Sequence, residues 1–338
     1  MLSQELLQSP IAILGAGSWG TALALHLSRL GQIVHLWTFN ETHARQMEKD
    51  RCNRKYLPEQ RFPPTLKIFF DLKLAIQNVS DILITVPSAA FCEVLTQLKP
   101  LLTPKQPLIW ATKGLDEQTG LLLHDIVLRI LGHRDAYAVL SGPSFAKEVA
   151  RGLPTAVVAA SLDLNFAKKI QQRFNSPRFR VYLTDDVLGV EIGGATKNVL
   201  AIATGISDGM GFGSNSRCAL MTRGLAEIMR LGLALGAKPE TLIGLTGLGD
   251  LVLTCTDDQS RNRRFGILLG RAFSPTAAEL EIGQVVEGKR NAELIYALGQ
   301  KHQIDMPIIK AVMHIIHGDV TPEMAMQELF SRQPKNEA

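Results

Sequence analysis

Lys197 stands where a basic side chain could take part in chemistry. It lies in an apolar helical stretch that also contains Glu191, Gly193 and Gly194. A lysine in such surroundings needs a partner for its charge, and a desolvated lysine can act as a general acid or base. The alternative is a charge that is simply paired inside a domain junction. Glycine in mid-helix costs about 1 kcal/mol relative to alanine, so the two glycines indicate a close approach by another segment.

Lys113 and Asp250 are the next two candidates. Lys113 follows the short apolar run Leu108–Trp110, and ligands of open α/β sheets bind at the carboxyl ends of strands. A solvated loop lysine is the alternative. Asp250 ends the glycine-rich turn Gly247-Leu248-Gly249. Its carboxylate could orient Lys197, accept a substrate hydroxyl or cap the following segment, and these three interpretations stay open.

Three arginines begin the helix that follows Ser260, which is placed as its N-cap. Arg261, Arg263 and Arg264 all lie in the first turn, at the positive end of the helix dipole, where each exposed cation is unfavourable by roughly 0.3–1 kcal/mol. A bound anion would remove this conflict, because guanidinium groups, free backbone N–H groups and the dipole all favour it. We therefore predict a phosphate or carboxylate site rather than a merely solvated basic face.

A glycine motif near the N-terminus predicts dinucleotide binding. The sequence Gly15-Ala16-Gly17-Ser18-Trp19-Gly20 follows the apolar run Ile11–Leu14 and precedes a helix at Thr21–Leu30, which Gly31 can end. The first glycine permits a tight turn, the second lets backbone N–H groups approach a pyrophosphate, and the third lets the helix pack on the strand. The alternative is that the glycines merely interrupt a strand.

The segment after the second strand leaves the choice between NAD and NADP open. An acidic residue there would hold a ribose diol, and an arginine would hold a 2′-phosphate. The tip of the strand reads Trp37-Thr38-Phe39-Asn40, and Glu41 and Arg45 lie just beyond it. Phe39 either stacks on the adenine or is an exposed aromatic at the end of a strand.

The elements that must position these residues divide the chain in two. Continuous apolar runs separated by helical stretches predict a doubly wound α/β domain with a parallel sheet, and after Tyr182 the patterns become helical. We therefore predict two domains, at residues 1–185 and 186–338, with the site where they meet. The expected strands are Ile11–Leu14, Ile33–Trp37, Leu66–Phe70, Ile82–Val86, Leu108–Trp110, Ala138–Leu140 and Ala156–Ala159; the expected helices are Asp186–Ser207, Ser216–Leu235, Pro239–Leu245, Arg261–Arg271, Asn291–Lys301, Pro307–His317 and Pro322–Phe330.

Composition excludes several classes of protein. With 338 residues, 46% hydrophobic and 20% charged, the chain is typical of a well-cored protein of about two domains, not of a disordered, collagenous or coiled-coil one. The net charge of +4 is too mild to predict nucleic-acid binding but suits an anionic substrate. Four cysteines without metal-ligand spacing predict neither a zinc site nor a disulfide scaffold, and His314 and His317 lack a third ligand. The stretch Val187–Ile206 contains charges, and residues 1–10 do not resemble a secretory signal, so we expect a cytoplasmic protein without a membrane span.

The order of these motifs closely resembles the bacterial NAD(P)-dependent glycerol-3-phosphate dehydrogenases, over nearly the whole chain. The resemblance implies a Rossmann-type N-terminal domain, a helical C-terminal domain like that of 6-phosphogluconate dehydrogenase, and reversible reduction of dihydroxyacetone phosphate to sn-glycerol 3-phosphate for phospholipid synthesis. The motifs are Gly-Ala-Gly-Ser-Trp-Gly-Thr at 15–21, Ala-Thr-Lys-Gly-Leu at 111–115, Leu-Ser-Gly-Pro-Ser-Phe-Ala at 140–146, Lys-Asn at 197–198, Gly-Leu-Gly-Asp-Leu at 247–251, Ser-Arg-Asn-Arg at 260–263 and Val-Val-Glu-Gly at 285–288.

The resemblance also implies residue roles, with NAD(P)H as cofactor, no metal and a homodimer as the expected assembly. Lys197 is similar to the catalytic proton donor and acceptor. The implied substrate contacts are Lys113, Gly142, Ser144, Lys197, Asp250, Ser260, Arg261 and Asn262. The expected cofactor contacts, from the glycine motif, the tip of the second strand and the resemblance together, are Gly15, Gly17, Ser18, Trp19, Gly20, Phe39, Lys113, Ala146, Arg261, Val285 and Glu287.

One departure and two rival interpretations accompany the resemblance. The family often carries His-Arg or an arginine pair after the second strand, where this chain has Phe39-Asn40, so a strict NADP preference is not implied. A β-hydroxyacid or ketopantoate type of reductase also joins a nucleotide motif to a helical lysine, but a carboxylate substrate does not explain the arginine-rich helix start. A nucleotide-sensing protein without turnover would not need Lys113, Lys197 and Asp250 together.

Overall fold

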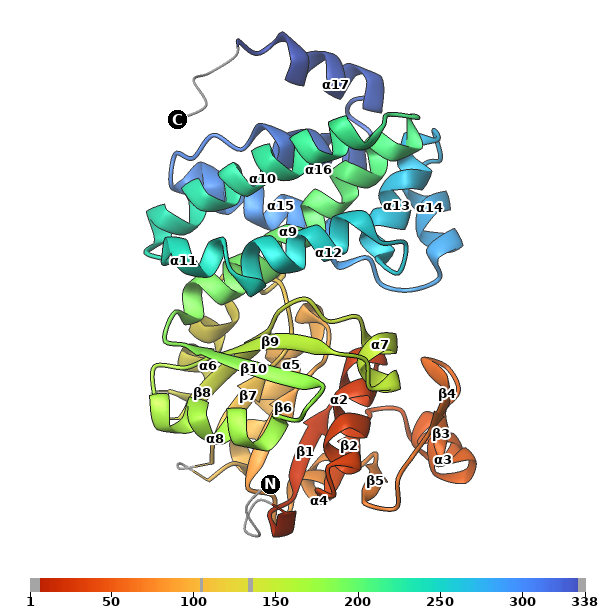
Figure 1. Ribbon diagram of the computed structural model, residues 1–338, viewed down its shortest axis with the longest axis vertical. Helices are drawn as coiled ribbons and strands as arrows, with labels where there is room; N and C mark the ends of the chain where they lie inside the picture. Colours follow the sequence, from red (N-terminus) through yellow and green to blue (C-terminus); the bar gives the residue numbers. More distant parts are fainter. Residues whose placement is uncertain (1–6, 104–105, 133–135, 334–338) are drawn as a thin grey trace. The chain divides into compact units, whose positions relative to one another are not determined.

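The computed structural model describes residues 7–103, 106–132 and 136–333. Residues 1–6, on which the expected absence of a secretory signal partly depends, lie outside these ranges. The chain forms two compact units. Unit 1 comprises residues 1–116 and 121–191, and unit 2 comprises 117–120 and 192–338 (Figure 1). The division falls inside one continuous helix, between Glu191 and Ile192.

A twisted sheet forms the centre of unit 1, as the apolar runs predict. In the described residues its strands follow the order β10-β9-β8-β7-β6-β1-β2-β5, and β1 pairs in parallel with both β2 and β6. Each run predicted as a strand is confirmed to within two residues at either end. The bounds are β1 (Ile11–Leu14), β2 (Val34–Trp37), β5 (Leu66–Phe69), β6 (Asp81–Ile84), β7 (Leu108–Trp110), β8 (Tyr137–Ser141), β9 (Thr155–Ala160) and β10 (Phe179–Thr184).

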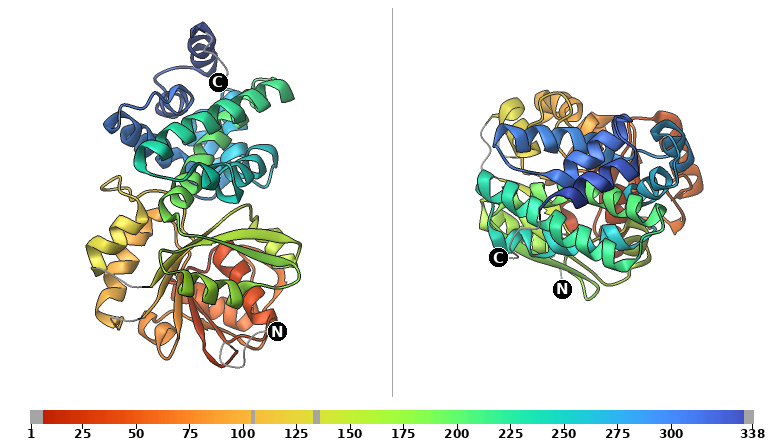
Figure 2. Two further views of the ribbon diagram at one scale, coloured as in Figure 1. Left: turned by 60° about the vertical axis from the view of Figure 1, so that its left-hand side comes forward. Right: turned by 90° about the horizontal axis from the view of Figure 1, so that it is seen from above.

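Helices cover both faces of this sheet, which confirms the doubly wound α/β class. Helices α2 and α8 pack together on one face, and α5 and α6 pack together on the other (Figure 2). The helix after the glycine motif ends as expected, with Gly31 in the left-handed region at φ +85°. The bounds are α2 (Ser18–Arg29), α3 (Glu41–Asp50), α4 (Leu72–Ile76), α5 (Ser88–Leu98), the 3₁₀ turn η1 (Lys99–Leu101), α6 (Leu123–Leu131), α7 (Ala146–Arg151) and α8 (Leu164–Phe174).

The expectation of an all-parallel sheet is wrong at one position, because β9 runs antiparallel to β8. The connection between them holds only the six-residue helix α7, which packs on α2. A helix of that length spans about 9 Å, shorter than the roughly 17 Å of a five-residue strand, so it does not return the chain for a parallel crossover. Three further strands were not predicted: β10, and the two-stranded pair β3 (Cys52–Asn53) with β4 (Leu57–Arg61).

The regular elements of unit 2 are all helices within its described residues, as predicted. Two helices, α12 and α14, were not predicted, and the expected helix Pro239–Leu245 ends at Leu242, before a π-helical turn. The bounds are α9 (Val187–Gly209), α10 (Ser214–Leu235), α11 (Pro239–Leu242), the π turn η2 (Leu245–Gly249), α12 (Asp250–Thr256), α13 (Arg261–Gly270), α14 (Pro275–Ile282), α15 (Glu287–Lys301), α16 (Pro307–His317) and α17 (Pro322–Ser331). No helix in the described ranges is both long and apolar enough to cross a membrane.

Helix α9 is enclosed by other helices, and glycines make this possible. All residues from Gly189 to Ser207 are buried, as expected for a helix without a polar face. At its crossing with α13, a Cβ on Gly205 would lie 2.1 Å from the carbonyl oxygen of Arg263, and one on Gly266 would lie 2.2 Å from that of Ile202. The two backbones are therefore in direct contact, which a side chain at either position would prevent.

A buried carboxylate holds the start of α16. Glu227 of α10 is 1% exposed, and its two oxygens accept the backbone N–H groups of Ile308 at 2.7 Å and Ile309 at 3.2 Å. The side chain of Met306, the N-cap residue of α16, makes no capping hydrogen bond. Burial raises the pKa of Glu227 to about 7, because desolvation outweighs the two N–H groups that favour the charged form.

We expect Glu227→Gln to change how stability depends on pH. Because the folded pKa lies above the unfolded value of 4.5, the folded protein keeps a proton that the unfolded chain has released. Glu227 therefore makes the protein less stable as pH rises from about 5 to about 7, by at most about 3 kcal/mol. The glutamine side chain does not titrate, so the variant does not lose this stability. The melting temperature of the variant should therefore rise relative to that of the parent between pH 5 and pH 8. A difference that is the same at every pH would contradict the prediction.

Candidate active site

The glycine motif adopts the conformation that its spacing predicts. Gly15 has φ +119°, and a Cβ there would lie 3.0 Å from the backbone of Thr85. A Cβ on Gly20 would lie 2.0 Å from the carbonyl oxygen of Gly15, so the start of α2 packs directly on the turn. Around Gly17 there is open space, and as N-cap it brings no side chain to the first N–H groups of α2. The turn therefore fits a pyrophosphate, which needs exposed N–H groups and room for close approach.

The other residues expected at the cofactor lie on nearby elements of unit 1. Ser18 and Trp19 are the first two residues of α2, and both are partly buried. Ala146 is the first residue of α7, which packs against α2. Phe39 follows β2 and is 84% exposed, so its ring is available for stacking.

Lys113, Gly142 and Ser144 come together although they lie on separate motifs. Lys113 follows β7 and the other two follow β8, and these neighbouring parallel strands end at the same edge of the sheet. The carbonyl oxygen of Gly142 accepts hydrogen bonds from Lys113 Nζ at 3.3 Å and from Ser144 Oγ at 3.0 Å. Gly142 has φ +140°, and a Cβ there would lie 3.0 Å from Val157 Cα, so a larger residue would disturb this arrangement.

In unit 2 the candidate catalytic lysine is held by an ion pair. Lys197 is 8% exposed and Asp250 is fully buried, and Lys197 Nζ lies 2.6 Å from Asp250 Oδ1. The ammonium also donates to Thr254 Oγ1 at 2.9 Å, while Thr254 donates to the carbonyl oxygen of Asp250 at 2.6 Å. Of the three roles left open for Asp250, orienting Lys197 is the one that this geometry supports. Thr254 was not predicted, although its position one helical turn after Asp250 was the available signal.

The close approach that Gly193 indicated is made by the turn before Asp250. A Cβ on Gly193 would lie 2.6 Å from the carbonyl oxygen of Thr246, and one on Gly247 would lie 1.8 Å from that of Leu242. The residues Leu245–Gly249 form a π-helical turn that continues directly into α12 at Asp250, rather than the open glycine turn that we expected. This packing brings Asp250 beside Lys197.

At the start of α13 the prediction of three conflicting arginines is only partly correct. Ser260 is the N-cap as expected, and its Oγ accepts the N–H of Arg263 at 3.2 Å. The Arg263 side chain is buried, however, and forms ion pairs with Asp208 and Asp258. It therefore needs no bound anion. Arg264 is exposed, and Arg261 is partly exposed.

Arg261 and Asn262 differ in how their side chains are used. The Arg261 guanidinium donates to Gln284 Oε1 at 3.3 Å, an exposed and weak contact. The Asn262 amide is used inside the unit, because it donates to Asn198 Oδ1 at 3.0 Å and accepts the N–H of Gly288 at 2.9 Å.

Two expected cofactor contacts lie near the start of α15. Val285 is 60% exposed, just before the helix. Glu287 is its first residue, and one of its carboxylate oxygens accepts a hydrogen bond from the Asn198 amide at 3.4 Å. Asn198 follows Lys197 directly, so the helix that carries the lysine is joined to both Asn262 and Glu287.

Another buried carboxylate, Glu191, was not predicted to have a role. It lies at the unit 1 end of α9 and accepts hydrogen bonds from Trp110 Nε1 at 2.9 Å and from the backbone N–H of His124 at 3.2 Å. His124 Nδ1 lies 2.7 Å from its other oxygen. Burial lowers the pKa of His124, but the hydrogen bond and charge of Glu191 raise it, and the net shift is upward. A charged residue in an apolar helix was the available signal for this cluster.

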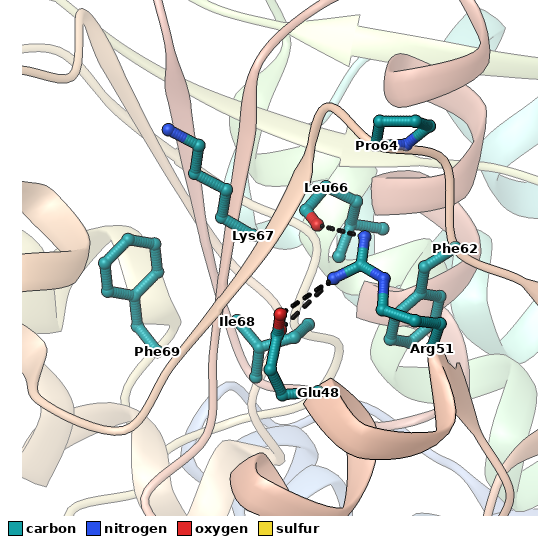
Figure 3. A pocket seen from close by; sticks show the side chains of 8 residues that line it. All are labelled: Glu48, Arg51, Phe62, Pro64, Leu66, Lys67, Ile68 and Phe69. Atoms are coloured by element: carbon teal, nitrogen blue, oxygen red, sulfur yellow. Dashed lines mark hydrogen bonds and ion pairs between the residues drawn. The ribbon is translucent and has the colours of Figure 1, made fainter.

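Unit 1 has a pocket of about 570 Å³ that none of the predicted site residues lines. Its arginine, Arg51, donates to the carbonyl oxygens of Pro63 and Leu66 and pairs with Glu48, so its charge is used to hold the loop before β5 (Figure 3). The remaining lining residues are Phe62, Pro64, Lys67, Ile68 and Phe69.

Among the described residues, no group of three or more His, Cys, Asp and Glu side chains could hold a metal ion. His314 and His317, which were not expected to be ligands, instead lie 2.8 Å from Asp319 Oδ2 and 2.6 Å from Glu293 Oε1.

Comparison with known proteins gives a consistent result over nearly the whole chain. The family described as NAD-dependent glycerol-3-phosphate dehydrogenase matches with its N-terminal part over residues 10–167 and with its C-terminal part over residues 186–327. A glycerol-3-phosphate dehydrogenase of Coxiella burnetii, named with NAD(P)+, is 54% identical over 98% of this chain and 100% of its own length. A glycerol-3-phosphate dehydrogenase of Glaesserella parasuis is 53% identical over 99% of this chain and 100% of its own length.

A solved structure agrees with these sequence matches. The crystal structure of the Coxiella burnetii glycerol-3-phosphate dehydrogenase has a TM-score of 0.94 at 53% identity, covering 96% of this chain and 100% of that one. Because both family models match and together cover most of the chain, and relatives at 53–54% identity match over nearly its whole length, the chain belongs to the family of NAD-dependent glycerol-3-phosphate dehydrogenases.

Proposed function

We propose that the protein catalyses the reversible reduction of dihydroxyacetone phosphate to sn-glycerol 3-phosphate with NAD(P)H. The observation that carries the proposal is Lys197, a nearly buried ammonium held 2.6 Å from the buried carboxylate of Asp250. Membership of the family supports the same reaction, since its relatives at 53–54% identity are named for it.

The residues of the glycine turn would hold the cofactor. Gly15 and Gly20 shape the turn, the open space at Gly17 admits the pyrophosphate, and the start of α2 carries Ser18 and Trp19 beside it. Phe39 would stack on the adenine, and Lys113, Ala146, Arg261, Val285 and Glu287 would make the remaining contacts. When bound, the dihydronicotinamide supplies the hydride that reduces the carbonyl carbon.

Lys197 supplies the proton that the reaction needs. As hydride reaches the carbonyl carbon, the C=O π bond breaks and negative charge forms on the oxygen. The ammonium stabilises that charge and transfers a proton to it, which completes the alcohol; in the reverse direction the neutral amine accepts the proton. Asp250 and Thr254 hold the Lys197 nitrogen in place. Less orientational entropy therefore has to be lost when the transition state forms.

The start of α13 would bind the phosphate of the substrate. The first backbone N–H groups of a helix have no partner within it, and they face an anion together with the helix dipole. Arg261 adds a guanidinium whose weak contact with Gln284 is easily exchanged. Ser260 and Asn262 flank this point, and Lys113, Gly142 and Ser144 would complete the substrate contacts.

The proposal extends to the organisation of the protein. Residues 1–185 would bind the cofactor and residues 186–338 the substrate, with the protein acting in the cytoplasm as a homodimer that supplies glycerol 3-phosphate for phospholipid synthesis. Light scattering on the purified protein tests the dimer.

The direct test of the function is NAD(P)H oxidation followed by absorbance with dihydroxyacetone phosphate. We expect turnover with this ketone and little with ketopantoate or a β-keto acid, because these lack a phosphate for the start of α13. No consumption of either dinucleotide with dihydroxyacetone phosphate would refute the proposed function.

We expect Lys197→Ala to lower kcat by about 10²–10⁴-fold, since it removes the proton donor, while dinucleotide binding survives. The substitution leaves Asp250 buried without its partner, which destabilises a protein by about 3–5 kcal/mol. The double variant Lys197→Ala/Asp250→Asn avoids this unpaired charge and should be equally inactive. Lys310→Ala, at an exposed ion pair of the same unit, is the control. Near-normal kcat in the folded double variant would sink the assignment.

We expect Arg261→Ala to raise KM for dihydroxyacetone phosphate by about 10- to 100-fold, the loss of a hydrogen bond to a charged group worth about 1.5–3 kcal/mol. The matched control is Arg264→Ala, which removes an exposed arginine from the same helical turn and should leave KM within about twofold if only general charge is lost. An unchanged KM in the Arg261 variant, or equal changes in both, would remove Arg261 from the phosphate site.

A further inference from the structure

The tip of β2 determines which groups can contact the ribose of a bound dinucleotide. In unit 1, β2 ends at Trp37, beside the end of its parallel neighbour β5 at Phe69. The polar side chains that follow directly are already used. Asn40 accepts the N–H of His43 at 2.8 Å as the N-cap of α3, and Asp71 accepts the N–H of Leu74 at 3.0 Å as the N-cap of α4.

Along the chain, Glu41 and Arg45 are the first acidic and the first strongly basic residue after β2. Between Trp37 and Glu48 the chain has no other Asp, Glu, Lys or Arg. They lie one turn apart on α3, with Arg45 donating to Glu41 Oε1 through its Nε at 3.0 Å and through its terminal nitrogen at 2.6 Å. Their side chains are 51% and 73% exposed, respectively, so the pair contributes little to stability and either member can change partner at small cost.

We propose that this exchangeable Glu41–Arg45 pair selects between the 2′-hydroxyl and the 2′-phosphate of the adenosine ribose and lets the protein accept both NAD and NADP. The inference rests on the proposed function, because it assumes that the glycine turn binds a dinucleotide. The Glu41 carboxylate accepts hydrogen bonds from a ribose diol, and the Arg45 guanidinium binds a phosphate in bidentate geometry. In the free protein the two side chains neutralise each other. When one of them binds the ribose or its phosphate, we expect the other to turn toward the solvent.

Phe39 provides a contact that does not distinguish the two cofactors. Its exposed ring stacks on adenine, which NAD and NADP share. Loss of this ring should therefore weaken both equally, whereas loss of either member of the pair should change their ratio. This difference separates failure of the selection from failure of the site.

The test uses ADP-ribose and its 2′-phosphate, which lack the nicotinamide and report binding without turnover. Dissociation constants from calorimetry on the full chain should lie within about tenfold of each other for the parent. Arg45→Gln should weaken the 2′-phosphate at least tenfold and leave ADP-ribose within twofold. Glu41→Gln should weaken ADP-ribose severalfold and tighten the 2′-phosphate. Ratios of kcat/KM for NADPH and NADH should move in the same directions.

Two controls complete the design. Arg54→Gln removes an exposed arginine from an i,i+4 pair beyond the other end of α3 and should leave both constants unchanged. Phe39→Ala should weaken both ligands by the same factor. A ratio that stays constant in the Glu41 and Arg45 variants, while the parent binds both ligands, overturns the selection alone. A parent that binds neither ligand overturns the proposed cofactor site as well.

Discussion

The ion pair between Lys197 and Asp250 is the constraint on which the helical unit depends. An ammonium taken out of water is tolerated only beside an opposite charge and further hydrogen bonds, and here Asp250 and Thr254 supply them. The carboxylate reaches the lysine because the π turn before it packs directly on Gly193. Enclosure of α9 thus has two effects: it excludes water from the lysine, and it holds the lysine in one orientation.

The need to pair a buried charge also distinguishes the arginines at the start of α13. Arg263 is buried, so it must be paired, and Asp208 and Asp258 neutralise it. Arg261 remains partly exposed with one weak neutral contact. A helix start that is uniformly basic in sequence therefore contains one buried, paired cation, Arg263, and two arginines with accessible side chains, Arg261 and Arg264.

Local patterns predicted the elements of this fold well where the chain makes standard units. The strand, glycine motif and helix from Ile11 to Gly31 are recognisable from the local order of apolar residues and glycines, and they form as expected. The reversal of β9 was not predictable from its apolar run, because strand direction depends on where the short α7 packs. The π turn before Asp250 could not be predicted either, because it packs against α9, a segment distant in the sequence.

The sequence by itself determined the α/β class of the N-terminal half and the helical class of the C-terminal half. It also determined the dinucleotide motif, the family resemblance and the candidate residues, because each of these depends on residue types at short spacings. Only the tertiary structure decided what those residues touch. It joined Lys113 to Gly142 across neighbouring strands, placed the Asp250 carboxylate against Lys197, and added the contacts of Thr254 and Glu191. These contacts join residues 29 to 81 positions apart, and burial fixes such partners only once the helices and strands have packed.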